Sequence, residues 1–122
     1  MSYKIKTGKA IIGDGKVEEE VSIGINNGRI TEVGKNLKNS YKEIIDYSDK
    51  ILMPGLIDAH VHLVYSGIRE NDAIEKLSDE YLAIRGVELA KKALGAGVTT
   101  LGDAGGQRNV VFGVRNAIND EV

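Results

Sequence analysis

Cysteine is absent from the 122-residue chain, so the chain can form neither a disulfide framework nor a metal site with thiolate ligands. Tryptophan is also absent, and with five tyrosines and one phenylalanine any hydrophobic core must be built mainly from aliphatic side chains. Proteins of reducing compartments rarely carry disulfides, and the lack of cysteine therefore leads us to expect a cytoplasmic location.

An excess of charge of one sign is missing as well, since 16 Lys and Arg nearly balance 18 Asp and Glu, for a net charge of −2. Without a basic stripe or a block of like charges, the composition gives no indication of nucleic acid binding. The first residues lack the apolar core of a signal peptide, and no stretch reaches the length of a membrane span. We expect an intracellular protein that binds neither nucleic acid nor membrane.

Glycine is abundant, with 15 residues, and turns that contain it divide the first part of the chain into short strands. Apolar side chains alternate with small or polar ones over residues 21–25, and Asn27–Gly28 follows, the strongest short signal for a β-hairpin. A second hairpin turn is expected at residues 13–15, and a further strand at 41–47. The pattern predicts a small antiparallel β-meander over residues 1–53.

After the single proline the pattern changes to an alternation of strands and helices. The expected order is a buried strand at 56–63, a loop at 64–77, a helix capped by Ser78, a buried strand at 98–101 and a second helix from Val110. Such alternation predicts right-handed βαβ units and a parallel sheet, and hence an α/β fold.

The two histidines of the chain both lie in the first of these α/β strands, as His60 and His62. Side chains alternate along a strand, so the two imidazoles share a face with Asp58. Neutral imidazoles bind divalent cations, and the working residues of parallel α/β folds lie at the carboxyl ends of strands. The paired spacing favours metal ligands over buried core histidines. A metal at this place would polarise a carbonyl group and lower the pKa of its water for hydrolysis.

Two aspartates are candidates for supporting roles. Asp58 is a ligand, a partner of an imidazole, or a turn residue, and we favour the second role because ligating histidines usually donate their other N–H to an acceptor. Asp103 ends the second strand and is either a site residue or a cap of the turn into the next helix, with neither favoured. Gly105–Gly106 lacks a full phosphate-binding pattern, and a structural turn is the preferred interpretation.

The run from Met53 to Leu63, MPGLIDAHVHL, resembles the amidohydrolase superfamily of metal-dependent hydrolases. Two further segments, Asn26–Ile30 and Ala96–Asp103, resemble the N-terminal hairpin and the second barrel strand of that family. The chain is most similar to the imidazolonepropionase and Xaa-Pro dipeptidase-like branch. Dihydroorotases fit less well, because they usually carry an arginine where Val64 stands.

The resemblance implies a TIM-like (β/α)8 barrel together with a small β-sandwich assembled from both ends of the chain. Residues 1–53 would be the first strands of the sandwich, and residues 54–122 the first two β/α units of the barrel. It also implies that His60 and His62 bind a divalent metal, usually zinc, with one or two ions in the complete site. The family's remaining ligands and its general base come from later strands, and a whole barrel needs about 250 residues.

The resemblance further implies that the parent protein hydrolyses C–N bonds in small-molecule amides, peptides or cyclic amides. We expect the 122-residue chain to be an N-terminal fragment that is inactive alone, because two histidines supply only part of a catalytic zinc site. Exposed strand edges and apolar helix faces favour a homo-oligomer. Two alternatives stay open: a truncated non-catalytic protein that folds by association, and a small metal-binding module without catalysis.

Overall fold

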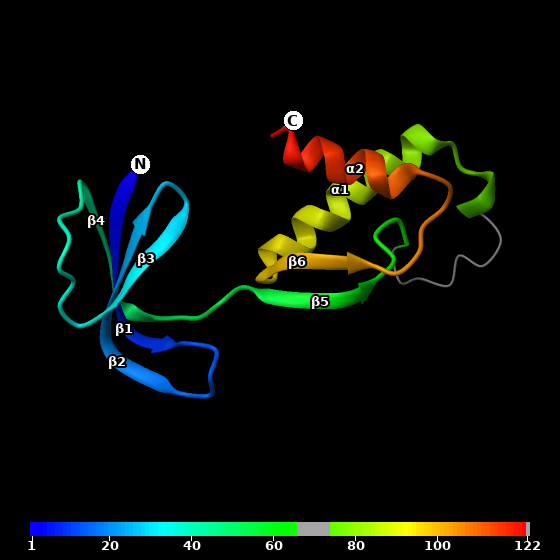
Figure 1. Cartoon of the computed structure of the whole chain (residues 1–122). Coiled ribbons are helices and arrows are strands. Elements are labelled where there is room, and N and C mark those ends of the chain that lie inside the picture. Colours follow the sequence, from blue (N-terminus) through cyan, green and yellow to red (C-terminus); the bar gives the residue numbers. More distant parts are fainter. Residues whose placement is uncertain (66–73, 122) are drawn as a thin grey trace. The chain divides into compact units, whose positions relative to one another are not determined.

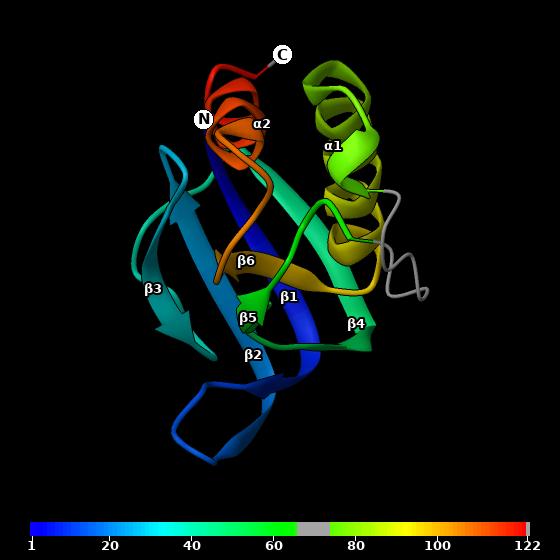
Figure 2. The same ribbon diagram turned by 90° about the vertical axis from the view of Figure 1, so that its right-hand side faces the viewer.

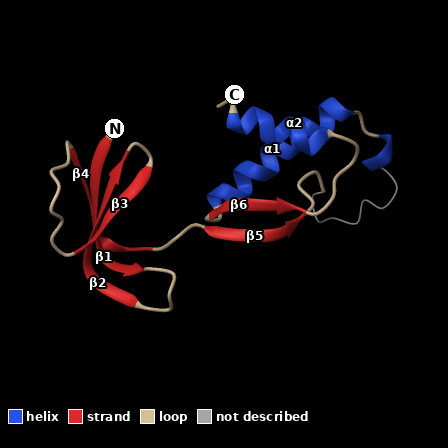
Figure 3. Ribbon diagram, viewed as in Figure 1, coloured by secondary structure: helices blue, strands red, loops and turns tan. Residues whose placement is uncertain are grey.

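The computed structural model of the chain describes residues 1–65 and 74–121 (Figure 1). The chain divides into two compact units, Met1–Pro54 and Gly55–Val122. Unit 1 consists of strands and loops, whereas the helices lie in unit 2 (Figure 3).

Unit 1 is one mixed four-stranded sheet with the strand order β3–β2–β1–β4. Its strands are β1 (Ser2–Ile11), β2 (Val17–Asn26), β3 (Arg29–Gly34) and β4 (Glu43–Leu52). The β1–β2 and β2–β3 pairs are antiparallel, as the two hairpin signals predict. Asn27 and Gly28 both have positive φ, 49° and 75°, as a type I′ turn requires. Both predicted hairpins are confirmed.

Strand β4 departs from the predicted meander. It begins at Glu43, within the expected range, but it pairs with β1 in parallel. The chain therefore passes from β3 at one edge of the sheet to the opposite edge, through residues 35–42. The prediction of an antiparallel fourth strand is wrong. The alternation of side chains specifies which face of a strand is buried, but it does not specify which strand pairs with it or in which direction.

The buried side chains of unit 1 lie along β1 and β2. Ala10, Val21 and Ile23 form this small core, and Ile25 and Leu52 pack against it. Other apolar side chains of the sheet stay exposed, and the exposed group includes Ile30, Val33, Ile44 and Ile51. The sheet thus leaves apolar surface uncovered within unit 1.

The crossing segment between β3 and β4 is attached to the sheet through one carboxylate. Glu32 accepts the Tyr41 hydroxyl at 2.7 Å and the backbone N–H groups of Lys38 and Asn39 at 3.0 and 3.1 Å. The Tyr41 side chain covers Gly24, where an added Cβ would lie 1.9 Å from the Tyr41 oxygen. Because Gly24 has no side chain, the Tyr41 ring fits over β2 and its hydroxyl reaches the Glu32 carboxylate.

Unit 2 contains β5 (Leu56–Val61), a short 3₁₀ helix (Ile74–Lys76), α1 (Asp79–Gly95), β6 (Val98–Asp103) and α2 (Val110–Asn119). Strands β5 and β6 are parallel, and both helices lie on the same side of the pair (Figures 1 and 2). The predicted order of strands and helices is confirmed. Of the loop expected at 64–77, residues 66–73 lie outside the described residues.

Helix α1 begins as the sequence predicts. The Ser78 hydroxyl accepts the backbone N–H of Tyr81 at 3.3 Å, which satisfies one of the unpaired donors of the first turn. The backbone N–H of Glu80 and the Ser78 hydroxyl hold the pKa of the Glu80 carboxyl below its usual value. Neither α1 nor α2, in the part of the chain that the structure describes, has the length and hydropathy of a membrane span.

The core of unit 2 lies where the two helices meet. Its buried members are Val64, Ile74, Leu82, Val110 and Val114. The helices approach closely at Gly86, where an added Cβ would lie 3.1 Å from a Val114 methyl group. Strand β5 is largely exposed, with 71% of Ile57 accessible. The expectation of a buried strand is wrong here, because helices cover only one side of the two-stranded sheet.

Candidate metal centre

The two imidazoles lie side by side at the carboxyl end of β5. His60 is the last residue but one of the strand, and His62 directly follows it. The ring centroids are 5.3 Å apart with the planes at 85°, and both residues are exposed. The structure thus brings together the two residues that the spacing paired, while metal ligation itself stays a prediction.

The ring of His62 is oriented by the loop that follows β6. Its Nδ1 lies 2.6 Å from the backbone oxygen of Gly105. A carbonyl oxygen only accepts hydrogen bonds, so Nδ1 carries a proton, and in the neutral ring Nε2 then keeps a free lone pair. Such a nitrogen is the form in which an imidazole binds a metal ion. The contact with Gly105 therefore leaves Nε2 of His62 without a hydrogen bond to that loop.

Asp103 connects the loops that follow the two parallel strands. It is the register partner of Val61, so the residues after each strand lie next to one another. Its Oδ2 accepts the backbone N–H of Leu63 at 2.8 Å, and its Oδ1 accepts that of Gly105 at 2.9 Å. Asp103 thus caps the turn towards α2 and also fixes the segment beside His62.

Asp58 makes a local contact. Its Oδ1 accepts the backbone N–H of His60 at 3.1 Å, a bond within its own strand. The predicted role of Asp58 as a partner of an imidazole stays a prediction. Over residues 1–65 and 74–121, no three His, Cys, Asp or Glu side chains converge in a way that could hold a metal ion. The histidine pair therefore fits part of a metal site, with two nitrogen donors.

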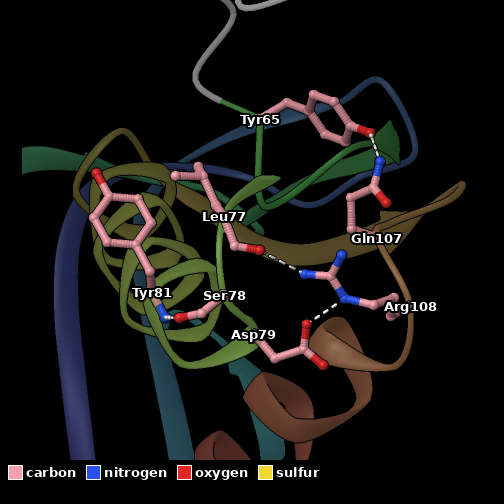
Figure 4. A network of polar contacts seen from close by, with 7 residues as sticks. All are labelled: Tyr65, Leu77, Ser78, Asp79, Tyr81, Gln107 and Arg108. Atoms are coloured by element: carbon pink, nitrogen blue, oxygen red, sulfur yellow. Dashed lines mark hydrogen bonds and ion pairs between the residues drawn. The ribbon is translucent and has the colours of Figure 1, made fainter. Parts of the chain in front are cut away.

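Arg108 forms a second connection between the same loops. Its guanidinium donates to the Asp79 carboxylate and, at 2.9 Å, to the backbone oxygen of Leu77 (Figure 4). Arg108 itself lies in the left-handed region, with φ of 53°. Sequence reasoning missed this contact because Arg108 and Asp79 are 29 positions apart and no local pattern relates them.

Gln107 and Tyr65 extend this network towards the histidines. The Gln107 side-chain amide donates to the Tyr65 hydroxyl at 3.1 Å (Figure 4). The Tyr65 ring stands edge-on to His62, with 5.8 Å between the ring centroids. The loop after β6 thus contacts the neighbourhood of His62 through Gly105 and through Gln107. The contact of His62 with Gly105 could have been anticipated from sequence, because the carboxyl ends of two parallel strands lie side by side. No local pattern indicates the contact between Gln107 and Tyr65.

A cavity of about 590 Å³ opens between the sheet and the helices of unit 2. Apolar side chains such as Val61, Leu101 and Phe112 line it, and neither histidine belongs to its lining. Asp103 and Gly105, which hold the segment beside His62, also line the cavity, so the candidate centre at the strand ends lies next to it.

The model of the amidohydrolase family matches residues 51–122 of the chain. An imidazolonepropionase from Bacillus thuringiensis is 47% identical over 66 residues, which cover 50% of this chain and 15% of the relative. An allantoinase from Bacillus licheniformis is 46% identical over 63 residues, or 52% of this chain and 13% of the relative. The predicted resemblance is confirmed.

Solved structures extend the likeness to both units. A Xaa-Pro dipeptidase with methionine bound in its active site matches 98% of the chain, with a TM-score of 0.83 and 30% sequence identity. The match covers 30% of that dipeptidase. The chain therefore spans less than a third of each of these relatives.

Proposed function

Because the chain belongs to the amidohydrolase family, we propose that it forms the beginning of a metal-dependent hydrolase that acts on C–N bonds. The observation that carries the proposal is the pair of adjacent imidazoles, His60 and His62, at the carboxyl end of β5. The bond from His62 Nδ1 to the loop after β6 supports it, since it leaves Nε2 free. Imidazole nitrogens suit zinc, which we propose as the metal, with one or two ions in the complete site.

We also propose that residues 54–122 supply the first two β/α units of a (β/α)8 barrel and residues 1–53 the first strands of a β-sandwich. In support, β5 and β6 are parallel and carry helices on one side only. The apolar cavity of unit 2 and the exposed apolar residues of the first sheet offer surface for further strands. A barrel and a sandwich would each cover such surface.

We propose that three residues of unit 2 hold a metal ion or orient one of its ligands. His60 and His62 would hold the cation, and the backbone oxygen of Gly105 keeps the His62 ring in the ligating tautomer. When bound, a divalent cation supplies Lewis acidity that polarises a carbonyl group and activates water. Catalytic zinc sites usually take three protein ligands, whereas the described residues offer two imidazoles. We therefore propose that the 122-residue chain alone is inactive.

For the substrate we propose a small-molecule amide, peptide or cyclic amide. The support is the family and the names of the relatives, which include an imidazolonepropionase, an allantoinase and a Xaa-Pro dipeptidase. A cytoplasmic location and a homo-oligomer complete the proposal. The absence of cysteine supports the first, and the exposed apolar surfaces support the second.

Zinc and cobalt titration of the purified chain tests the metal site. Each of His60→Ala and His62→Ala should weaken binding by more than about tenfold, since losing a ligand costs at least as much as losing a group that orients one. Tyr65→Phe is the matched control, because it alters the neighbour of His62 and keeps both imidazoles. Binding that is equal in the wild type and both histidine variants would overturn the proposed site.

Turnover is tested separately, with zinc and a panel of amides and dipeptides. The 122-residue chain should show none, and a longer protein that contains this sequence should hydrolyse a member of the panel. Robust turnover by the chain alone would contradict the proposed inactivity. Zinc binding without turnover in the longer protein would instead favour a metal-binding module.

A further inference from the structure

We propose that Asp103 is a positioning residue for His62, because it fixes the Gly105 carbonyl that selects the Nδ1-protonated imidazole. The contacts run through one peptide segment. The Asp103 carboxylate accepts the N–H of Gly105, and the oxygen of the same glycine accepts the His62 Nδ1–H. The consequence for metal binding rests on the proposed function, whereas the effect on the tautomer does not.

The second oxygen of Asp103 holds the histidine side of the contact. It accepts the N–H of Leu63, the residue directly after His62. One carboxylate therefore binds the chain on both sides of the imidazole contact, across 40 positions of sequence. Hydrogen bonds to an ionised carboxylate are roughly twice as strong as neutral ones, so this arrangement resists a shift of either segment.

The conformation of Gly105 makes this arrangement possible. Its φ of 154° is one that residues with a side chain rarely adopt, and a Cβ there would lie 3.9 Å from the His62 ring. The space is sufficient, but the backbone geometry favours glycine. The exposed His62 ring could otherwise pair with water through either nitrogen. A fixed acceptor at 2.6 Å from Nδ1 removes that choice.

Arg108 allows the proposed role to be separated from simple attachment of the loops. It joins the loop after β6 to Leu77 and Asp79, near the start of α1, and has no bond to His62 or Gly105. If Asp103 acted only by holding the loops together, loss of the Arg108 contacts would have the same effect on the imidazole. If Asp103 positions the Gly105 carbonyl, the two substitutions differ.

Long-range ¹H–¹⁵N NMR spectra of the metal-free chain at alkaline pH report the tautomer of each neutral imidazole directly. We expect wild-type His62 to carry its proton on Nδ1. In Asp103→Asn and Asp103→Ala the His62 signals should move towards a mixture of tautomers, and zinc affinity should fall by about 10- to 100-fold. Arg108→Gln should leave the His62 tautomer unchanged.

Asp14→Asn is the matched control. Asp14 accepts the N–H of Lys16 at 3.0 Å, the same two-residue arrangement that links Asp103 to Gly105, and it lies in unit 1. This variant should keep both the His62 tautomer and the zinc affinity of the wild type. A change of tautomer in Asp14→Asn or in Arg108→Gln would show a general effect on the fold and overturn the proposal.

Other results would overturn it directly. These are a wild-type His62 with its proton on Nε2, and folded Asp103 variants that keep the wild-type tautomer. Should both Asp103 variants unfold, hydrogen exchange in the wild type decides, because the amides of Leu63 and Gly105 must then be protected and free exchange contradicts their bonds to Asp103.

The outcomes separate this inference from the proposed function. An Nδ1-protonated His62 that depends on Asp103, in a chain without zinc affinity, supports the inference and contradicts the metal site. Zinc binding that is lost in His62→Ala but retained in both Asp103 variants, with an unchanged tautomer, contradicts the inference alone.

Discussion

Glu32 in unit 1 and Asp103 in unit 2 each hold a loop, and these two carboxylates connect very different parts of the sequence. Glu32 of unit 1 accepts three donors that follow it by six to nine positions. Asp103 of unit 2 accepts one donor two positions later and one that lies 40 positions earlier. The chemistry is the same, but only the second carboxylate joins distant segments.

The difference follows from where each carboxylate lies. The donors to Glu32 belong to the segment that directly follows β3, so they are close to it in sequence. The parallel strands β5 and β6 need a long connection, and their carboxyl ends bring together segments that lie far apart. His62 and the loop after β6 meet in this way. The candidate centre thus lies at the carboxyl ends of β5 and β6, where this parallel pair brings His62 beside the loop after β6.

The largest expected effect on either unit comes from a substitution in the hydrophobic core of unit 2. Leu82 is fully buried and belongs to the same core as Val64. Leu82→Ala should lower the free energy of unfolding of unit 2 by about 2–5 kcal/mol and expose the Leu63 amide to exchange. Urea unfolding followed by the amide signals of unit 2 measures this effect.

Leu94→Ala is the control for that substitution, since 62% of Leu94 is exposed on the same helix. It should change the free energy of unfolding by about 0.5 kcal/mol or less. Equal losses in the two variants would contradict the packing described for α1.

In unit 1 the corresponding substitution is Gly24→Ala. The added Cβ would lie 1.9 Å from the Tyr41 oxygen, so the ring must move and its bond to Glu32 is lost. We expect a loss of about 1–3 kcal/mol in the free energy of unfolding, measured by urea unfolding. Gly95→Ala near the end of α1, where a Cβ meets nothing within 4 Å, should be neutral or stabilising by up to about 1 kcal/mol. A neutral Gly24→Ala would show that Tyr41 does not need this space.

The smallest expected effect concerns the titration of Glu32. The Tyr41 hydroxyl, more than the backbone N–H groups of Asn39 and Lys38, holds the pKa of the Glu32 carboxyl below its usual value. Because this pKa is depressed in the folded state, the stabilisation is present above the unfolded pKa and is lost as the pH falls through the folded one. Tyr41→Phe should raise the pKa of Glu32 towards its usual value. The pH interval over which the stabilisation is lost, between the unfolded and the folded pKa, should then become narrower.

Carboxyl ¹³C titration by NMR measures this shift. Tyr47→Phe is a suitable control, because 47% of Tyr47 is exposed on β4 and the three hydrogen bonds that Glu32 accepts come from Lys38, Asn39 and Tyr41 instead. An unchanged Glu32 titration in Tyr41→Phe would show that the backbone donors alone hold the loop. Glu32 would then resemble Asp103, which accepts two backbone N–H groups.

Local interactions explain which features could be predicted from sequence. The Asn27–Gly28 turn and the Ser78 cap involve residues within three positions, so the residue types alone favour these conformations. The shared face of His60 and His62 likewise follows from the alternation of a single strand. These features depend little on the rest of the chain.

Only the tertiary structure decided which segments meet. The parallel partner of β4, the Gly105 oxygen at His62 and the bond from Arg108 to Asp79 all join residues far apart in sequence. Strand alternation and helix periodicity set which side of an element is buried, but not which neighbour it packs against. The sequence by itself therefore determined the two imidazoles and their common face, and the pairing of β5 with β6 decided how His62 is held.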